Sequence, residues 1–420
     1  MHKGRDLMSE RIQLQLSAMA HGGPALGRYE GRVVFVPYGV PGDTVVVEIE
    51  MSKKDWARAR LLEVVTPSPD RASPPCPYFG PHGCGGCQWQ HIRYEAQLGY
   101  KTAVVRDQLA RLAGFSEAPV RPMQSVGEPW AYRNHVQLHP APEGLGYISA
   151  DDNRRVQPVE RCLIMHPLLA ELYEQLDLEI EGLVQLSLRA GVRTGQRMVI
   201  FETEDEEPFE IEVDVPVSCV LLRRDGLPIT LVGWDFLEEE VAGHRYKVSA
   251  GSFFQVNTAG AEALVHTVSD MLAPQAHQRL LDLYAGVGLF SVSLAKHVAR
   301  VIAIEENPIS VLDARENLQR AGLDNVEVIQ GDVTEMLSSL EGPIELVVAD
   351  PPRAGCGTAV VTRLAELGVE RLALVACDPA TLARDARTLG ECDYRLVEVC
   401  PLDLFPQTYH IESVALFVRG

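Results

Sequence analysis

The chain has 420 residues, 46% of them hydrophobic, and is long enough to form two or three domains with sizeable cores. Its formal net charge of −20 argues against binding to nucleic acid through overall charge. Residues 1–165 hold 19 Lys and Arg against 17 Asp and Glu, a balance of +2, which leaves 19 against 41, or −22, for residues 166–420. Contact with a phosphate backbone is therefore expected in the N-terminal half or at local clusters of arginine.

The sequence predicts a cytoplasmic protein with no membrane partner, and a monomer by default. No run of about 18 apolar residues indicates a membrane span, and residues 1–6 lack the apolar core of a secretion signal. Nine cysteines in that compartment argue against a disulfide framework. They form an early group of four and a later group of five, which need separate explanations.

Residues 9–66 alternate between apolar and polar side chains, with glycine-containing turns between the apolar runs. Several short strands in so few residues predict a small β-barrel of the OB type over residues 1–68, a common platform for oligonucleotides. Its turns carry cations that either contact phosphates or form a solvated hairpin. These candidate phosphate contacts are Lys53, Lys54, Arg58 and Arg60.

A proline-rich linker, residues 67–77, leads into a glycine-rich stretch with three cysteines. Cys84 and Cys87 form a Cys-x2-Cys pair, and Cys76 lies eight residues earlier, a spacing that indicates a metal site. Three thiolates need a fourth ligand, and Cys162 is the available one. The spacing leaves structural zinc and an iron–sulfur cluster open. It disfavours a radical S-adenosylmethionine site, whose cysteines are closer together.

The rest of the predicted central domain, residues 69–250, begins with a helix. Apolar residues recur at helical spacing from Tyr94 to Gly114, a suitable residue to end a helix. Residues 120–250 read mostly as β-strands with acidic outer faces. The segment Trp130–Asn134 combines aromatic rings with a cation, so it either stacks on bases or supplies ordinary core aromatics.

The third predicted domain, residues 251–420, contains a strand that breaks at Gly286-Val287-Gly288 and continues as a helix. Such a turn lets a ligand approach the backbone and the free N–H groups of the helix, although the glycines could also be purely structural. A dinucleotide site needs a third glycine where this chain has Ser291. The turn therefore predicts a nucleotide cradle of another kind.

Three further apolar runs in this region each end in a carboxylate. Glu305 follows the first at the spacing at which a carboxylate accepts both hydroxyls of a ribose. Asp332 follows the second and would lie beside an adenine, and Asp350 follows the third in the sequence Asp350-Pro351-Pro352-Arg353. The series resembles an S-adenosylmethionine-dependent methyltransferase more than a dehydrogenase.

Two later residues are candidates for chemistry. Cys377 comes at the end of an apolar strand and directly before a helix, where α/β active sites lie and where a thiol is biased toward thiolate. Glu412 begins the last apolar strand after a turn that can bring it toward the same crevice. An inert core thiol and a surface carboxylate are the respective alternatives.

Together these segments resemble the RNA uracil-5-methyltransferase family over essentially the whole chain. The early cysteines and the N-terminal barrel are similar to its 23S ribosomal RNA branch, of the RumA type. The motifs that carry the resemblance are the four early cysteines, Phe254-Gln255-Val256-Asn257, Asp282-Leu283-Tyr284 with the glycines that follow, Asp350-Pro351-Pro352-Arg353, Cys377-Asp378-Pro379 and His410-Ile411-Glu412-Ser413.

The resemblance implies an α/β fold, in which a class I Rossmann-like methyltransferase domain follows a β-rich central domain and an N-terminal TRAM barrel. It implies a 23S ribosomal RNA substrate, S-adenosylmethionine as methyl donor, Cys377 as nucleophile and Glu412 as the base that removes the C5 proton. It makes Cys76, Cys84, Cys87 and Cys162 the ligands of a [4Fe-4S] cluster. The donor-binding residues expected from motif and resemblance are Gln255, Tyr284, Gly286, Glu305, Asp332 and Asp350.

The chain departs from the family pattern at two places. It has Ala376 and Asp378 beside the nucleophile, where serine and asparagine are usual, and the added carboxylate would raise the thiol pKa or alter contacts to the base. Its first cysteine loop is two residues longer. Two rivals stay open: a transfer-RNA uracil-5 or RNA cytosine-5 methyltransferase, and a noncatalytic RNA-binding or ribosome-assembly factor.

Overall fold

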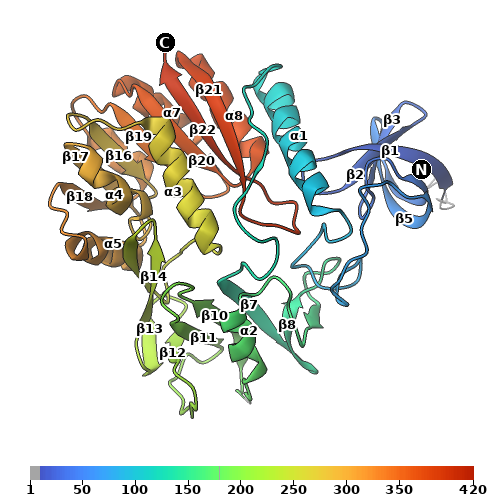
Figure 1. Cartoon of the computed structure of the whole chain (residues 1–420), viewed down its shortest axis with the longest axis horizontal. Coiled ribbons are helices and arrows are strands. Elements are labelled where there is room, and N and C mark those ends of the chain that lie inside the picture. Colours follow the sequence, from blue (N-terminus) through green and yellow to red (C-terminus); the bar gives the residue numbers. More distant parts are fainter. Residues whose placement is uncertain (1–9, 179) are drawn as a thin grey trace, which may run out of the picture.

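The computed structural model describes residues 10–178 and 180–420 (Figure 1). The N-terminal residues on which the expectation about a secretion signal depends, and the first nine residues of the predicted barrel, lie outside the described residues. Within the described ranges, no helix is long and apolar enough to cross a membrane.

The N-terminal strands close into a five-stranded barrel in the order β1-β2-β3-β5-β4, which confirms the predicted barrel. In β1 the apolar residues Ile12, Leu14 and Leu16 are buried while the polar residues between them are exposed, because side chains alternate across a strand. The barrel strands are β1 (Arg11–Met19), β2 (Ala25–Tyr29), β3 (Arg32–Val36), β4 (Thr44–Ser52) and β5 (Trp56–Thr66).

The middle part of the chain forms a seven-stranded sheet, in the order β13-β12-β11-β10-β7-β8-β9, and a two-stranded hairpin follows it. Helix α2 (Pro167–Glu174) packs on β10 and begins with proline, whose missing N–H costs nothing in the first turn. The strands are β7 (His135–Ala141), β8 (Gly144–Ile148), β9 (Val156–Pro158), β10 (Leu183–Ala190), β11 (Arg197–Thr203), β12 (Ser218–Leu222), β13 (Pro228–Val232), β14 (Phe236–Val241) and β15 (His244–Ser249).

The C-terminal region contains an eight-stranded sheet in the order β18-β17-β16-β19-β20-β22-β21-β6. The first five strands are parallel, whereas β22 runs antiparallel to both β20 and β21. The strands are β6 (Gln124–Ser125), β16 (Arg279–Leu283), β17 (Arg300–Glu305), β18 (Val326–Gln330), β19 (Leu346–Ala349), β20 (Arg371–Ala376), β21 (Tyr394–Asp403) and β22 (Glu412–Arg419).

Helices cover both faces of this sheet (Figure 1). Neighbouring residues of a strand point to opposite faces, so Leu280 and Leu281 of β16 belong to two different apolar clusters. Helices α3 (Thr258–Leu272), α4 (Leu289–Leu294) and α5 (Pro308–Arg320) pack on one face. Helices α6 (Val333–Ser339), α7 (Gly357–Glu366) and α8 (Pro379–Glu391) pack on the other, and a short 3-10 helix, Ala295–His297, follows α4.

Helix α1 (Tyr94–Ala113) joins the barrel to the large sheet. It ends at Gly114 with a φ of 79°, which confirms the predicted end of the helix. Its buried residues share one apolar cluster with the barrel interior and with the α8 side of the sheet. Lys101 of α1 is fully buried and donates to Asp403 of β21 at 2.6 Å, and a buried pair of this kind is costly to break.

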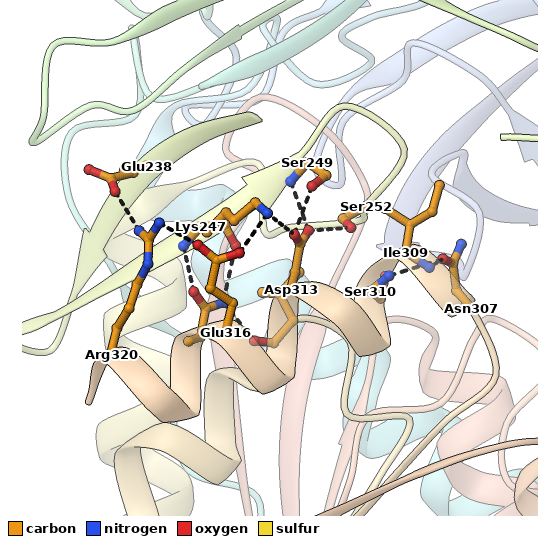
Figure 2. A network of polar contacts seen from close by, with 12 residues as sticks. Glu238, Lys247, Ser249, Ser252, Asn307, Ile309, Ser310, Asp313, Glu316 and Arg320 are labelled. Carbon is orange, nitrogen blue, oxygen red and sulfur yellow. Dashed lines mark hydrogen bonds and ion pairs between the residues drawn. The ribbon is translucent and has the colours of Figure 1, made fainter. Parts of the chain in front are cut away.

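A polar network fixes the β14–β15 hairpin to helix α5 (Figure 2). Asp313 of α5 is buried and accepts hydrogen bonds from the backbone N–H of Ser249 at 2.8 Å and from its hydroxyl at 2.7 Å. The hydroxyl of Ser252 donates to the same carboxylate at 2.6 Å, and Lys247 Nζ lies 3.7 Å away. Both oxygens of Asp313 are therefore occupied, and the hairpin is held against the sheet.

Candidate active site

The residues expected to act on the donor and the substrate lie at one edge of the large sheet. Strands β16, β17, β19 and β20 are parallel and in register, so their carboxyl ends meet there. Tyr284, Asp350 and Cys377 directly follow β16, β19 and β20, and Glu305 ends β17. Because β22 is antiparallel, its first residue, Glu412, lies at the same edge.

The turn after β16 holds its backbone in conformations that leave room for a ligand. Tyr284, Gly286 and Gly288 all have positive φ, and no heavy atom lies within 4 Å of a Cβ built at Gly286. Gly288 is the capping residue directly before helix α4. The carboxylate of Glu305 accepts the Gly286 N–H at 2.8 Å, so the residue expected at a ribose also braces the glycine turn.

Ser291, which stands where a dinucleotide site has glycine, has its own structural role. Its hydroxyl donates to Asp282 Oδ2 at 2.6 Å in the fully buried base of the turn. Burial raises the pKa of Asp282 to about 7. Asp332 is exposed and its side chain caps helix α6 by accepting the Glu335 N–H at 3.0 Å.

A series of polar groups, partly or fully buried, leads from the loop before α3 to Glu412. Gln255 Nε2 donates to Asp350 Oδ2 at 3.3 Å. Burial raises the pKa of Asp350 to about 7. Burial, together with the charge of Asp350, raises the pKa of Glu412 well above its usual range, and its Oε1 has no hydrogen-bond partner. Glu412 is therefore a buried carboxyl, and the surface alternative is wrong.

Cys377 is half-buried between β20 and α8, next to these carboxyls. Burial raises the pKa of its thiol to about 11, and the charges of Glu412, Asp350 and Asp378 act in the same direction, while Arg353 opposes them. The expectation that the helix N-terminus would favour thiolate is therefore wrong for the free protein. Burial, assisted by the carboxylates, outweighs the helix end, and Asp378 acts in the predicted direction as the smallest of these contributions.

A histidine from the barrel also reaches this site, and the sequence analysis missed it. His21 lies in the turn between β1 and β2, and its Nε2 is 2.8 Å from Asp378 Oδ2. Gly23 in the same turn lies against Tyr409, because a Cβ there would come within 2.6 Å of Tyr409 Cδ1. His21 and Asp378 are 357 positions apart, and no local pattern indicates the contact.

The loop that precedes Glu412 is held by residues from the early part of the chain. The backbone carbonyl of Gln407 accepts N–H bonds from Gln88 at 3.0 Å and Trp89 at 2.9 Å. Gln97 of α1 bonds to both the side chain and the backbone N–H of Gln407. Tyr132 donates to the carbonyl of Pro406 at 3.1 Å. Because Tyr132 is buried, it is a core residue and not an exposed stacking platform.

The four early cysteines line a single pocket between the linker region and the loop at residues 161–164. The Gly86 N–H donates to Cys84 Sγ at 3.3 Å, and burial raises the pKa of Cys84 and of Cys87 to about 12. In residues 10–178 and 180–420, no three His, Cys, Asp or Glu side chains are arranged to hold a metal ion. Cys76, Cys84, Cys87 and Cys162 are thus placed together by the lining of one pocket.

The barrel cations differ in what they contact. Arg60 forms ion pairs with Glu48 and Glu50, so its charge is already engaged. Lys53, Lys54 and Arg58 are exposed at or beside the turn between β4 and β5.

Models of known families match two regions of the chain, the C-terminal region with the candidate site and the N-terminal barrel. A model of the tRNA (Uracil-5-)-methyltransferase family matches residues 230–419, which include the sheet edge described above. A TRAM domain model matches residues 12–62, the five-stranded barrel.

Similar proteins extend the match to nearly the whole chain. An uncharacterized RNA methyltransferase of Thermosynechococcus vestitus is 35% identical and covers 97% of this chain and 98% of its own. The 23S rRNA (uracil(1939)-C(5))-methyltransferase RlmD of Shewanella piezotolerans is 31% identical, covering 98% and 97%.

A solved structure is also similar over its full length. The tRNA (uracil-54, C5)-methyltransferase of Pyrococcus abyssi, in complex with S-adenosyl-L-homocysteine, superposes with a TM-score of 0.78 at 27% identity, covering 97% of this chain and 100% of its own. The chain described here therefore belongs to the RNA uracil-5-methyltransferase family and is an S-adenosylmethionine-dependent enzyme that modifies RNA.

Proposed function

We propose that the protein transfers a methyl group from S-adenosylmethionine to C5 of a uridine in 23S ribosomal RNA, through a covalent adduct with Cys377. The observation that carries the proposal is the half-buried thiol of Cys377 at the same sheet edge as a buried, unpaired carboxyl, Glu412. The similarity to RlmD over 98% of the chain supports the ribosomal substrate.

C5 of uracil is a poor nucleophile, and Cys377 and Glu412 overcome this by acting one after the other. The sulfur of Cys377 adds to C6, and the electron pair of the C5–C6 bond moves into an enolate whose C5 attacks the methyl carbon of the sulfonium. The sulfonium leaves as a neutral thioether. Glu412 then takes the proton from C5, and elimination breaks the C6–S bond and restores the double bond. The target base must leave its stack for the sulfur to reach C6.

The raised pKa of Glu412 fits the role of a base. A carboxylate with a high proton affinity removes a weakly acidic proton better than an ordinary one. The positive sulfonium of a donor bound beside Asp350 would favour the ionised carboxylates, because an opposite charge stabilises the charged form.

The donor would lie along the sheet edge on six residues. Glu305, which lies beside the glycine turn, would accept the ribose hydroxyls, and Asp332, at the start of α6, would contact the adenine. Gln255 and Asp350 would hold the amino-acid part, since they already contact each other in a part-buried position. Tyr284 and Gly286 form the turn that would pass under the ribose.

We also propose that Cys76, Cys84, Cys87 and Cys162 hold a [4Fe-4S] cluster. Two observations support it: all four cysteines line one pocket, and Cys84 Sγ already accepts a backbone N–H, as cluster sulfurs do. Such a group would be structural or RNA-facing here, since methyl transfer requires no electron. A brown protein with broad absorbance near about 400 nm is expected; colourless protein with stoichiometric zinc would contradict it.

The proposal also covers the domain division, the phosphate contacts, the oligomeric state and the location of the enzyme. The barrel, central and methyltransferase domains would divide near residues 68 and 250, with the exposed Lys53, Lys54 and Arg58 meeting phosphates. The enzyme would act as a monomer in the cytoplasm. A transfer-RNA substrate is the second candidate, favoured by the similarity to the Pyrococcus abyssi enzyme.

The test is release of tritium from RNA labelled at C5 of uridine, with S-adenosylmethionine present. We expect release from 23S ribosomal RNA and none from Cys377→Ala. Cys392→Ala, at the other end of the same helix, is the matched control and should retain activity. Release only from transfer RNA would keep the chemistry and replace the substrate. Full activity of Cys377→Ala would refute the mechanism.

A further inference from the structure

The turn between β1 and β2 of the barrel touches both sides of the catalytic crevice. His21 contacts Asp378, which follows the nucleophile directly, and Gly23 packs on Tyr409, three residues before Glu412. The turn is itself fixed, because the indole N–H of Trp89 donates to the carbonyl of Gly23 at 3.0 Å. The turn therefore fixes the position of His21 beside Asp378.

Asp378 needs such a partner because of where its charge lies. One of its oxygens caps helix α8 by accepting the Thr381 N–H at 2.8 Å, and the other faces His21 at 2.8 Å. An uncompensated carboxylate there would oppose ionisation of the neighbouring Cys377 thiol, which already faces Glu412 and Asp350.

The two partners also affect each other's titration. The hydrogen bond from His21 lowers the pKa of Asp378, and the bond to Asp378 raises the pKa of His21, against burial and the nearby Arg384. The imidazole thus carries a positive charge at and somewhat above the pH at which a free histidine loses it.

We propose that His21, supplied by the barrel, is a positioning residue that offsets the charge of Asp378 and so allows the Cys377 thiol to ionise for addition to the base. The inference rests on the proposed function of Cys377 and gives the barrel a part in the chemistry in addition to RNA contact. It also accounts for an aspartate at a position where the family usually has asparagine: in this chain the extra negative charge is matched by a cation from another part of the fold.

The test measures ionisation of the thiol without RNA or methyl donor. The rate at which iodoacetamide alkylates Cys377 is followed by peptide mass spectrometry across pH for the full chain. His21→Ala should slow alkylation about fivefold near pH 7, because a negative charge a few ångströms away shifts a thiol pKa by up to about one unit. The difference should shrink as the pH rises above the pKa of His21, where the wild-type imidazole is also neutral.

Two further variants separate charge from tethering. His21→Gln keeps a hydrogen-bond donor without the charge and should behave like His21→Ala if charge is what matters. In an Asp378→Asn background, in which the amide oxygen can still cap α8, His21→Ala should have little effect. His297→Ala, an exposed histidine on the opposite side of the sheet, is the control and should match wild type.

The outcomes separate failure of the His21 proposal from failure of the proposed function. Equal alkylation profiles for wild type and His21→Ala would overturn the proposal, as would wild-type behaviour of His21→Gln or an undiminished effect in the Asp378→Asn background. A slowed alkylation with no methyl transfer to any RNA would leave the charge pairing in place and refute the proposed function instead. The same variants should lower kcat more than they raise KM for RNA if the pairing acts on the thiol.

Discussion

Two groups of buried carboxylates in this protein are built in opposite ways. Asp313 has both oxygens occupied by donors from the β14–β15 hairpin, and Lys247 lies beside it (Figure 2). The fully buried Arg189 bonds to the carbonyls of Ser249 and Ser252 in the same network. Glu412 is equally buried, yet one of its oxygens has no hydrogen-bond partner among the described residues, and the charge that acts on it is that of another carboxyl, Asp350.

The difference separates a structural carboxylate from a reactive one. A buried charge that is fully hydrogen-bonded fixes the parts of the chain that donate to it. A buried carboxyl without donors has a high proton affinity and an unmet need for a partner, which a substrate or cofactor can fill. Replacing the carboxyl by an amide should therefore lower activity but not stability at Glu412, and stability but not activity at Asp313.

The largest effect is expected for Glu412→Gln. The amide cannot take the C5 proton, so turnover should fall at least about a hundredfold. Methyl addition should still occur, so a covalent RNA–protein adduct should accumulate, visible as a band of reduced mobility in a denaturing gel. The midpoint of urea unfolding should stay the same or rise, because a poorly solvated carboxyl is removed. Loss of activity through unfolding would contradict this.

The matched change in the structural network is Asp313→Asn. It keeps the shape of the side chain but places an NH2 group among donors and removes the charge from their hydrogen bonds. We expect a loss of about 2 kcal/mol in the free energy of unfolding, measured in urea. Folded protein at low temperature should release tritium at nearly the wild-type rate. Equal stability to wild type would mean that the network in Figure 2 does not hold the hairpin.

A smaller effect is expected on the pH dependence of the free energy of unfolding, through Asp282. Its hydrogen bonding is intermediate between that of Asp313 and that of Glu412. Ser291 donates to one of its oxygens, while the other has no partner. Its pKa is raised by burial to about 7, against about 4 for an unfolded aspartate, so between these values the folded chain binds the extra proton. Its contribution to stability is therefore present below about pH 4 and lost as the pH rises toward 7.

Asp282→Asn removes this titration. The free energy of unfolding should then fall less between pH 5 and pH 8 than it does in wild type, by at least about 1 kcal/mol. Urea unfolding at the two pH values checks this, with Asp313→Asn as the comparison. An unchanged pH dependence would show that Asp282 titrates normally.

Much of the fold follows from local patterns. The barrel, the end of α1 at Gly114 and the parallel strands after which Glu305 and Asp350 lie are confirmed, because strand alternation and glycine turns are encoded within a few residues. The two-residue strand β6 was not predicted. It pairs with β21 at the sheet edge, and a strand that short has no period to detect.

The site was only partly predictable, for a physical reason. Chain position is enough to place Cys377 and Glu412 at one sheet edge, since both follow from strand direction. The high pKa of the Cys377 thiol depends first on its burial and then on the carboxyls around it in space, so the helix N-terminus alone gave the wrong direction. His21 belongs to a barrel turn, and its contact with Asp378 depends on how the barrel docks.

The hydrogen bonds between α1 and residues 403–407 have a consequence for folding during synthesis. Gln97 and Lys101 meet their partners Gln407 and Asp403 across 310 and 302 positions of sequence. Synthesis proceeds from the N-terminus at about 5–20 residues per second, so the barrel and α1 are complete well before residues 403–407 are made. The buried Lys101 has no counter-charge until then. The loop before Glu412 can therefore pack on α1 only after these residues have been made, and a chain truncated before residue 403 would lack the carboxylate that keeps Lys101 compatible with burial.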